Sequence, residues 1–165
     1  MVILKAKRKD SAGYISHLGK GDMVFAFFSS VSYHLEGKDN WGSRFPRLLL
    51  DLCDTGMVKY EHLDELLEEL NIICFELQKL PLSAAVYDIG DLSLPIPWEV
   101  LPGAENNNLA QPWVTPRGDI SYFNCLPEII QYAKTLKSSI FLMFSYEEDQ
   151  WEPMKKGRSY WIADK

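Results

Sequence analysis

Apolar side chains recur at helical spacing most clearly between Glu61 and Leu80. Leucines and an isoleucine follow one another there at intervals of three and four residues, which places them on one side of a helix. Pro81 lacks a backbone N–H and cannot continue the hydrogen-bond ladder, so the pattern predicts a helix that stops just before it. The opposite side of this helix is predicted to be exposed and strongly acidic. Its acids are Asp64, Glu65, Glu68, Glu69 and Glu76.

Three other segments are expected to be helical. They span residues 25–35, from about 45 to 55, and 119–136. The first has large apolar residues at helical spacing and should end near Gly37. In the second, Pro46 falls in the first turn, where its missing N–H costs little, and Gly56 marks the end. Asp119 is expected to cap the third, because its carboxylate can accept hydrogen bonds from the N–H groups of the first turn.

Shorter segments, in which apolar and polar residues alternate or β-branched residues are frequent, predict strands. They span residues 2–9, 14–18, 84–89 and 139–146, and the glycines and small polar residues between the first two favour a hairpin. A loop rich in Pro, Gly and Asn is expected over residues 91–108. Together these elements predict an α+β fold in which a small, mostly antiparallel sheet packs against about three to four helices. A single domain should span residues 1–165, with the segment 147–165 left unassigned.

The composition agrees with a packed globular domain. Hydrophobic residues make up 47% and charged residues 24% of the 165 positions, values close to the average for folded proteins. Cys53, Cys74 and Cys125 have neither the spacing of a zinc site nor that of a disulfide framework, which suits buried thiols in a reducing cytoplasm. No apolar run approaches the roughly 20 residues of a membrane helix. We therefore expect a cytoplasmic protein without metal, cofactor or membrane contact.

The charge balance bears on the kind of partner. Acidic residues number 23 and basic residues 17, which gives a net charge of −6. Nucleic-acid binding rests on attraction of phosphates to Lys and Arg, so this balance argues against DNA or RNA as the partner. A basic protein is favoured instead, because an acidic surface attracts it and speeds association. A nuclease, whose own active site attracts phosphate, is one natural partner of this kind.

Candidate catalytic groups are few and lie outside any recognised motif. His34, Asp39 and Arg44 could act as base, orienting group and oxyanion stabiliser. Asp88 and Asp91 could hold a metal ion or transfer protons. A structural role is the simpler interpretation of each, for example as an aspartate that caps a turn. The residues alone leave two alternatives to a dedicated binding protein, namely a general adaptor and a small hydrolase built on these histidine and aspartate side chains.

Several short motifs occur in an order that indicates a relationship. Phe27–Glu36 reads FFSSVSYHLE and Trp41–Pro46 reads WGSRFP, and the leucine- and glutamate-rich helix follows them. Leu80-Pro81, Val86–Ile89 and Pro97-Trp98 come next. Over residues 25–145 the chain resembles a family of bacterial immunity proteins from polymorphic toxin systems, the one numbered seventy.

The resemblance implies a non-enzymatic α+β antidote that binds a cognate toxin domain in a one-to-one complex and blocks its active site or its access to substrate. The toxin is expected to be basic, most simply a nuclease. Candidate contacts are acids and tryptophans in and beside the predicted loops, since such acids attract a cationic partner and such rings anchor interfaces. They are Glu36, Asp39, Trp41, Asp88, Asp91, Trp98 and Glu99.

Overall fold

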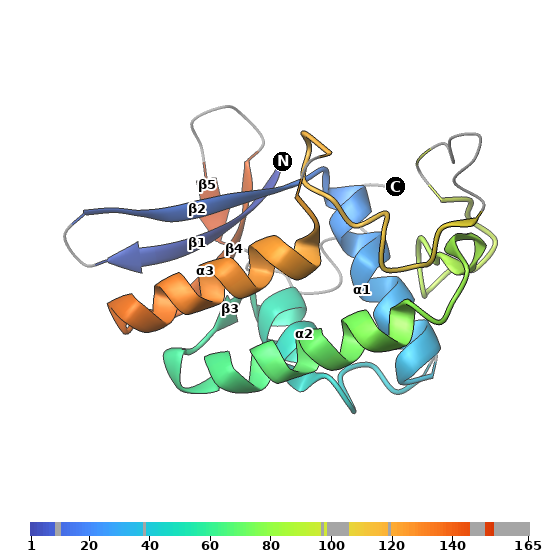
Figure 1. Cartoon of the computed structure of the whole chain (residues 1–165), viewed down its shortest axis with the longest axis horizontal. Coiled ribbons are helices and arrows are strands. Elements are labelled where there is room, and N and C mark those ends of the chain that lie inside the picture. Colours follow the sequence, from blue (N-terminus) through green and yellow to red (C-terminus); the bar gives the residue numbers. More distant parts are fainter. Residues whose placement is uncertain are drawn as a thin grey trace.

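A computed structural model describes residues 1–8, 11–37, 39–96, 98, 106–118, 120–145 and 151–153 of the chain. These residues form an antiparallel sheet with helices on one side of it, which confirms the predicted single α+β domain (Figure 1). No helix within these ranges is both long enough and apolar enough to cross a membrane.

The sheet is built around two adjacent strands, β1 and β4. Its strands are β1 (Val2–Arg8), β2 (Ser11–Gly19), β3 (Met57–Val58), β4 (Ile140–Ser145) and β5 (Trp151–Pro153). β1 and β2 form the predicted hairpin, and β4 pairs with the other edge of β1, so that Leu4 lies opposite Leu142. Along the far edge of β4, β3 pairs at Ile140 and Phe141 and β5 pairs further on. The strand predicted over residues 139–146 is therefore the centre of the sheet, while β3 and β5 were not expected.

The predicted helices are all present. The helical elements are α1 (Gly21–Leu35), η1 (Arg47–Thr55), η2 (Tyr60–His62), α2 (Leu63–Leu77), η3 (Leu82–Ala84) and α3 (Tyr122–Leu136). η1 has the wide turn of a π-helix, and it ends as predicted at Gly56, which has a φ of 72° and donates its N–H to Asp51 O. Asp119 lies outside the described residues. Ser121 caps α3, because its Oγ accepts a hydrogen bond from the N–H of Phe123.

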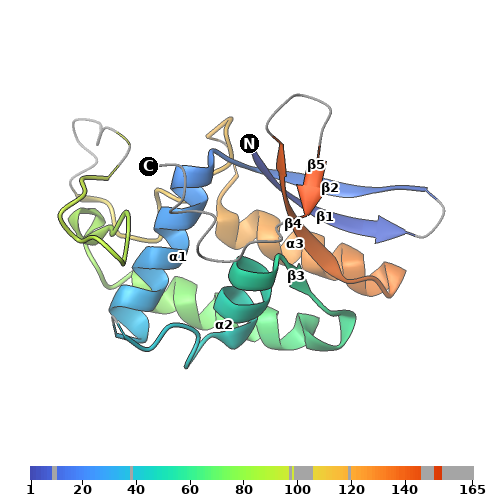
Figure 2. The ribbon, with the colours of Figure 1, turned by 180° about the vertical axis from the view of Figure 1, so that it is seen from behind.

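The apolar sides of the helices and one face of the sheet enclose a common core. The buried side chains of that face include Val2, Leu4, Ala6, Leu18, Val58, Ile140 and Leu142. α3 lies directly on β1 and β2, and α2 lies beyond α3 (Figure 1). Seen from behind, η1 lies in front of α2 and packs against it (Figure 2). α2 is therefore held by α3 on one side and by η1 on the other, and one of its faces points outward.

α1 is buried on every side and not along a single stripe. Each residue from Val24 to Ser32 is buried, the serines included. The Phe27 ring is surrounded by other aromatic rings, with its centroid 5.5 Å from that of Trp113 and 5.6 Å from that of Tyr122. Tilted and edge-on ring pairs of this kind add to the stabilisation that burial provides. A helix buried in this way needs a hydrogen-bond partner for each polar side chain that it carries into the interior.

The segment predicted as a strand over residues 84–89 runs alongside α1 and does not join the sheet. Ser30 Oγ donates to Val86 O (3.2 Å) and accepts from the Val86 N–H (2.9 Å). The N–H of Ile89 donates to Ser29 Oγ (3.4 Å). The strand prediction is wrong because side chains of α1 supply the hydrogen bonds that a neighbouring strand would otherwise provide.

Two glycines with the same backbone conformation allow the packing of the turn between α1 and η1 to be tested. Gly42 has a φ of 74°, and an added Cβ would lie 2.4 Å from side-chain atoms of Leu50. Gly118 has a φ of 73°, with nothing within 4 Å of an added Cβ. Gly118→Ala should therefore lower the free energy of unfolding by about 1 kcal/mol, because only the left-handed backbone conformation is unfavourable for alanine. Gly42→Ala should lower the free energy of unfolding by about 2–3 kcal/mol, because the Leu50 side chain must also move. Urea denaturation measures both losses, and equal losses would contradict the close packing at Gly42.

Candidate functional site

The loop that follows α1 is organised by one carboxylate, that of Glu36. Its Oε1 accepts hydrogen bonds from the N–H groups of Arg44 (2.9 Å) and Phe45 (2.8 Å). Its Oε2 accepts from the N–H of Gly42 (2.8 Å) and from Ser32 Oγ (3.1 Å). Both oxygens of this predicted contact residue are thus occupied within the chain, and they fix the path of the loop.

Asp39 and Trp41 lie in the loop that Glu36 holds. Asp39 is exposed, so its carboxylate faces solvent. Trp41 is half-buried, packs on the core, and donates its indole N–H to Asp54 Oδ2 of η1 at 3.1 Å. Trp41 therefore ties the loop to η1 and exposes only part of its ring.

The predicted aspartates on the segment beside α1 both cap turns. Asp88 is only 3% exposed, and its Oδ1 accepts a hydrogen bond from the N–H of Gly90 (2.8 Å). Asp91 is exposed, and its Oδ1 accepts from the N–H (3.1 Å) and the Oγ (2.6 Å) of Ser93. This turn-capping role was the simpler interpretation of both residues. Asp91 differs from Asp88 in that its carboxylate also reaches the surface.

The last of the predicted contacts lie at the end of the same segment. Trp98 is half-buried, and its ring centroid lies 5.6 Å from that of the fully buried Trp113, nearly edge-on. Glu99 lies outside the described residues. That the seven predicted contact residues touch a partner remains a prediction. Within the described part of the chain, the members with exposed carboxylates are Asp39 and Asp91.

Side chains of the alternative hydrolase bind backbone groups of the fold in the described structure. His34 Nε2 donates to Ala84 O at 2.7 Å, a bond that holds the segment beside α1. Asp88 is buried in its own turn, and Arg44 donates to Leu35 O at 3.3 Å. The described residues also contain no group of three or more His, Cys, Asp and Glu side chains that could hold a metal ion. The described residues therefore offer no metal site to the hydrolase hypothesis.

The outward face of α2 presents acids in its N-terminal half and just before it. The exposed acids are Glu61, Asp64, Glu65 and Glu68. Asp64 pairs with Lys134 of α3, and Glu65 pairs with Arg47 of η1. The other two acids form no ion pair within the described ranges. Their charges are therefore available to a partner.

The pKa values of two glutamates on the η1 side of α2 are shifted in opposite directions. Glu65 Oε2 lies 2.6 Å from Arg47 Nε, and the hydrogen bond from this arginine lowers the pKa of the Glu65 carboxyl. Glu69 is buried, and burial raises the pKa of its carboxyl, although it accepts from the N–H groups of Arg47 (3.0 Å) and Leu48 (2.8 Å). The prediction that Glu69 belongs to the exposed acidic face is wrong. Its side chain points inward because it binds the first N–H groups of η1.

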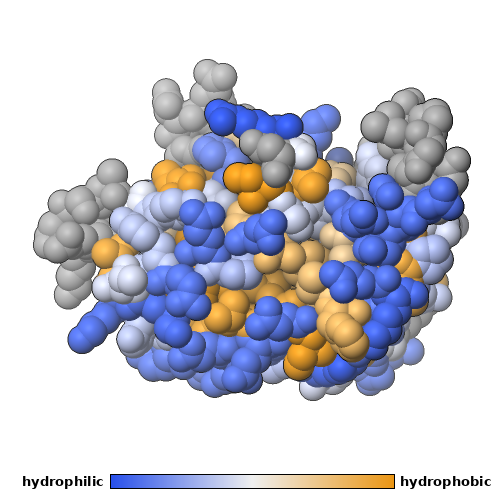
Figure 3. Space-filling view, viewed as in Figure 1, coloured by the Kyte–Doolittle hydropathy of each residue, from blue (hydrophilic) through white to orange (hydrophobic). Residues whose placement is uncertain are grey.

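The C-terminal half of the same face of α2 exposes apolar side chains. Ile72 is 44% exposed and Phe75 is 61% exposed. Lys79 Nζ lies 4.0 Å from the centroid of the Phe75 ring. In Figure 3 an orange patch interrupts the blue surface over α2. The exposure of these two residues could have been predicted from the sequence, because Ile72 and Phe75 fall outside the apolar stripe that predicts the buried side of the helix.

A hollow of about 380 Å³ lies beside this patch, between α2 and α3. It is lined by Cys74, Gln78, Asn108, Ala110, Gln111, Ser121, Phe123 and Asn124. Cys74 is half-buried, whereas the sequence predicted a buried thiol. Side-chain amides make up most of the polar lining, so the hollow offers both donors and acceptors of hydrogen bonds.

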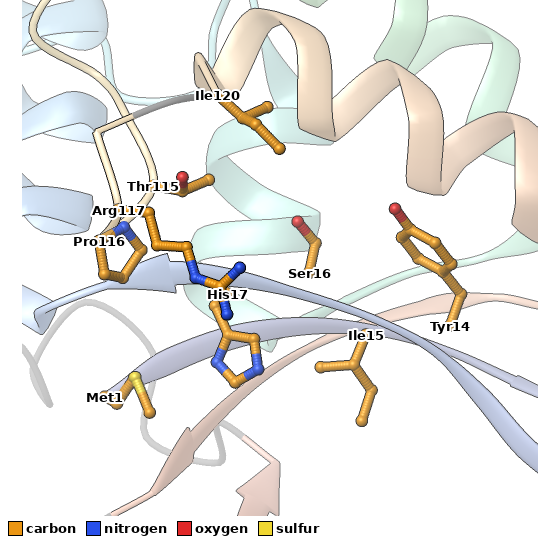
Figure 4. Close-up of a pocket in the computed structure, with 9 residues that line it drawn as sticks. All are labelled: Met1, Tyr14, Ile15, Ser16, His17, Thr115, Pro116, Arg117 and Ile120. Carbon is orange, nitrogen blue, oxygen red and sulfur yellow. The ribbon is translucent and has the colours of Figure 1, made fainter.

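A second hollow, of about 420 Å³, lies between β2 and the loop before α3 (Figure 4). Ile15 and His17 of β2 line one side, and Pro116, Arg117 and Ile120 line the other. Arg117 extends across the hollow toward His17 (Figure 4). The lining of this hollow mixes apolar side chains, hydroxyl groups and the basic side chains of His17 and Arg117, and it lies on a different part of the molecule from the acids of α2.

The motif order that indicated a family is matched by a family model. The model of Immunity protein 70 matches residues 9–142, which is most of the chain. This chain belongs to the Immunity protein 70 family. The resemblance is confirmed, and the match begins closer to the N-terminus than residues 25–145 suggested. Membership in an immunity family of polymorphic toxin systems implies toxin neutralisation. Neither the curated proteins nor the solved structures include a match to the chain.

The motifs that mark this immunity protein have structural roles in the fold. Within Phe27–Glu36, Ser30 binds the backbone of Val86, and the carboxylate of Glu36 holds the next loop. Trp41 in the second motif donates to η1. These residues hold the scaffold together.

Replacement of Glu36 tests whether its carboxylate holds the loop. Glu36→Gln exchanges an acceptor oxygen for an NH₂ group that faces backbone N–H donors, and it should lower the free energy of unfolding by about 1–3 kcal/mol. Asp39→Asn, an exposed change in the same loop, should alter it by less than about 0.5 kcal/mol. Thermal denaturation of the two variants measures the difference. An effect of Glu36→Gln as small as that of the control would show that the loop does not depend on these bonds.

Proposed function

We propose that this immunity protein neutralises a cognate bacterial toxin domain by binding it directly, in the cytoplasm and as a one-to-one complex, and by covering its active site or substrate cleft. Family membership supports the antidote role. The kind of partner is supported by the exposed acids of α2. The proposal rests chiefly on Glu61 and Glu68, which form no ion pair within the described part of the chain.

A nuclease fits these charges best. Its active site must attract phosphates, so Lys and Arg gather around its cleft. An acidic protein surface competes for the same cations, and the net charge of −6 draws a cationic partner toward this chain. Binding over the cleft would then exclude the nucleic acid by its bulk and by charge repulsion. The immunity protein needs no catalytic group of its own for this role.

The loops around α1 are the second surface that the proposal includes. Asp39 and Asp91 expose their carboxylates, and Trp41 and Trp98 expose part of their rings. α2 lies on the near side in Figure 1, whereas the loop after α1 lies on the near side in Figure 2. A toxin interface of ordinary size would bury about 1,200–2,000 Å² in total. Because the two surfaces point in different directions, substitutions can test them separately.

Co-expression tests the antidote role. The toxin candidate is the C-terminal domain of a large secreted protein encoded beside this chain, produced in bacterial cells with and without the immunity protein. We expect survival only in its presence, and co-purification of the two proteins as a one-to-one complex. Nuclease activity of the purified domain should fall as the immunity protein is added. A domain that kills the cells regardless and does not bind the chain would refute the proposal, and modest affinity for several unrelated proteins would indicate an adaptor.

Charge reversal on α2 should slow association with the toxin. Glu61→Lys/Glu68→Lys replaces unpaired acids by cations and should lower the association rate constant about tenfold or more at low salt. The control Asp22→Lys/Glu128→Lys makes the same change in net charge at exposed acids of α1 and α3 and should slow association less. Stopped-flow mixing measures both rates. The difference should shrink as salt screens the charges.

A third pair of substitutions separates the two surfaces. Asp39→Lys/Asp91→Lys reverses the exposed charges of the loops and again changes the net charge by the same amount. A larger effect of this pair than of the α2 pair would place the main electrostatic contact on the loops. Equal effects of all three pairs would show that net charge acts alone, and would contradict a specific role of the α2 face.

A further inference from the structure

The exposed apolar side chains of α2 adjoin each other. Ile72 and Phe75 are three residues apart, so they are neighbours on the helix surface. Isolated apolar residues are ordinary on protein surfaces, whereas adjoining ones with a charged rim are typical of binding sites. The rim here includes Glu68, one turn before Ile72, and Lys79, whose Nζ lies 4.0 Å from the Phe75 centroid. The patch therefore has the form of a partner contact.

The hollow between α2 and α3 begins beside Phe75. Cys74 precedes this residue and Gln78 follows one turn later, and both line the hollow. Gln111 and Asn124 bring further side-chain amides to it. The Asn124 amide makes no hydrogen bond within the described part of the chain. Amides can both donate to and accept from peptide groups, so they suit a loop of another protein.

The charges around the patch indicate what kind of partner could bind there. Glu68 lies four residues before Ile72 and seven before Phe75, so these side chains share one face of the helix. Glu61 adds, at the start of that face, a further carboxylate without an ion pair in the described ranges. Lys79 already pairs with Glu76 at 3.0 Å, so a second copy packed on this face would add further carboxylates without a free cation from the patch to balance them. A cationic protein brings compensating charges, and such an occupant is the toxin domain of the proposed function.

We propose that Phe75 anchors the toxin interface by entering an apolar pocket in the cationic surface of the toxin domain, while a toxin loop occupies the hollow between α2 and α3. This inference rests on the proposed function and specifies which side chains provide the tight contact. The acids of α2 speed the encounter, because charge acts at a distance. Phe75 and Ile72 slow the dissociation, because their apolar area is buried only in the finished complex.

Truncation of the patch tests the anchor. Phe75→Ala should weaken binding to a catalytically inactive toxin domain at least about 30-fold, mainly through faster dissociation. Ile72→Ala should weaken it about fivefold. The matched control is Ile15→Ala on β2, since Ile15 is 42% exposed and Ile72 is 44% exposed; this control should change the affinity less than about twofold. Surface plasmon resonance measures the rates, and an unchanged Tm of each variant shows that its fold is retained.

A photo-crosslinking residue gives a result that does not depend on affinity. Benzoylphenylalanine in place of Phe75 should crosslink to the toxin domain, and the same residue in place of Ile15 should not. If the wild-type chain protects cells while Phe75→Ala binds with undiminished affinity, the anchor is overturned and the proposed function stands. If the wild-type chain itself neither binds nor protects, the proposed function falls, and the anchor falls with it.

Discussion

Burial of α1 on every side is the constraint on which the rest of the structure depends. A helix in that position carries Ser29, Ser30 and Ser32 into the interior, where an unpaired hydroxyl costs about 1–3 kcal/mol. Ser30 binds both backbone groups of Val86, which lays a segment distant in sequence along the helix. Ser32 donates to Glu36, the carboxylate that also binds the following loop. Short polar side chains inside an apolar helix thus set the path of the chain on both sides of α1.

Elements with a strong pattern of their own could be predicted from the sequence, and elements that depend on distant partners could not. The apolar stripe of α2 and the proline after it predict a helix and its end. Residues 84–89 resemble a strand because a short apolar run fits any extended chain, and their hydrogen-bond partners, Ser29 and Ser30, lie far away in sequence. The buried residues of η1 are Leu48, Leu49, Leu52 and Cys53, a spacing that also fits one face of an α-helix, so the sequence predicts a helix there but not its wide turn.

For the candidate site, the sequence indicates residue types but not their exposure. Glu36 and Asp88 were predicted to lie in or beside loops, yet their carboxylates bind backbone N–H groups of the adjoining turns. No local pattern separates such a capping acid from one that faces solvent, because both favour turns. Phe75 is the converse case. It lies opposite the apolar stripe of α2, so its exposure could have been predicted by the same periodicity that predicts the helix.

The two sides of α2 separate the residues that stabilise the fold from those that we propose to bind the toxin. Inward side chains such as Leu66 and Ile73 are buried in the core, and Glu69 holds the start of η1. Outward side chains such as Glu68 and Phe75 are exposed, and substitutions at such positions cost little stability. Under the proposed function, changes at these outward residues would alter toxin binding while the scaffold stays folded. Two of the family motifs, Phe27–Glu36 and Trp41–Pro46, lie on α1 and its loop, where side chains such as Ser30 and Glu36 hold the fold together.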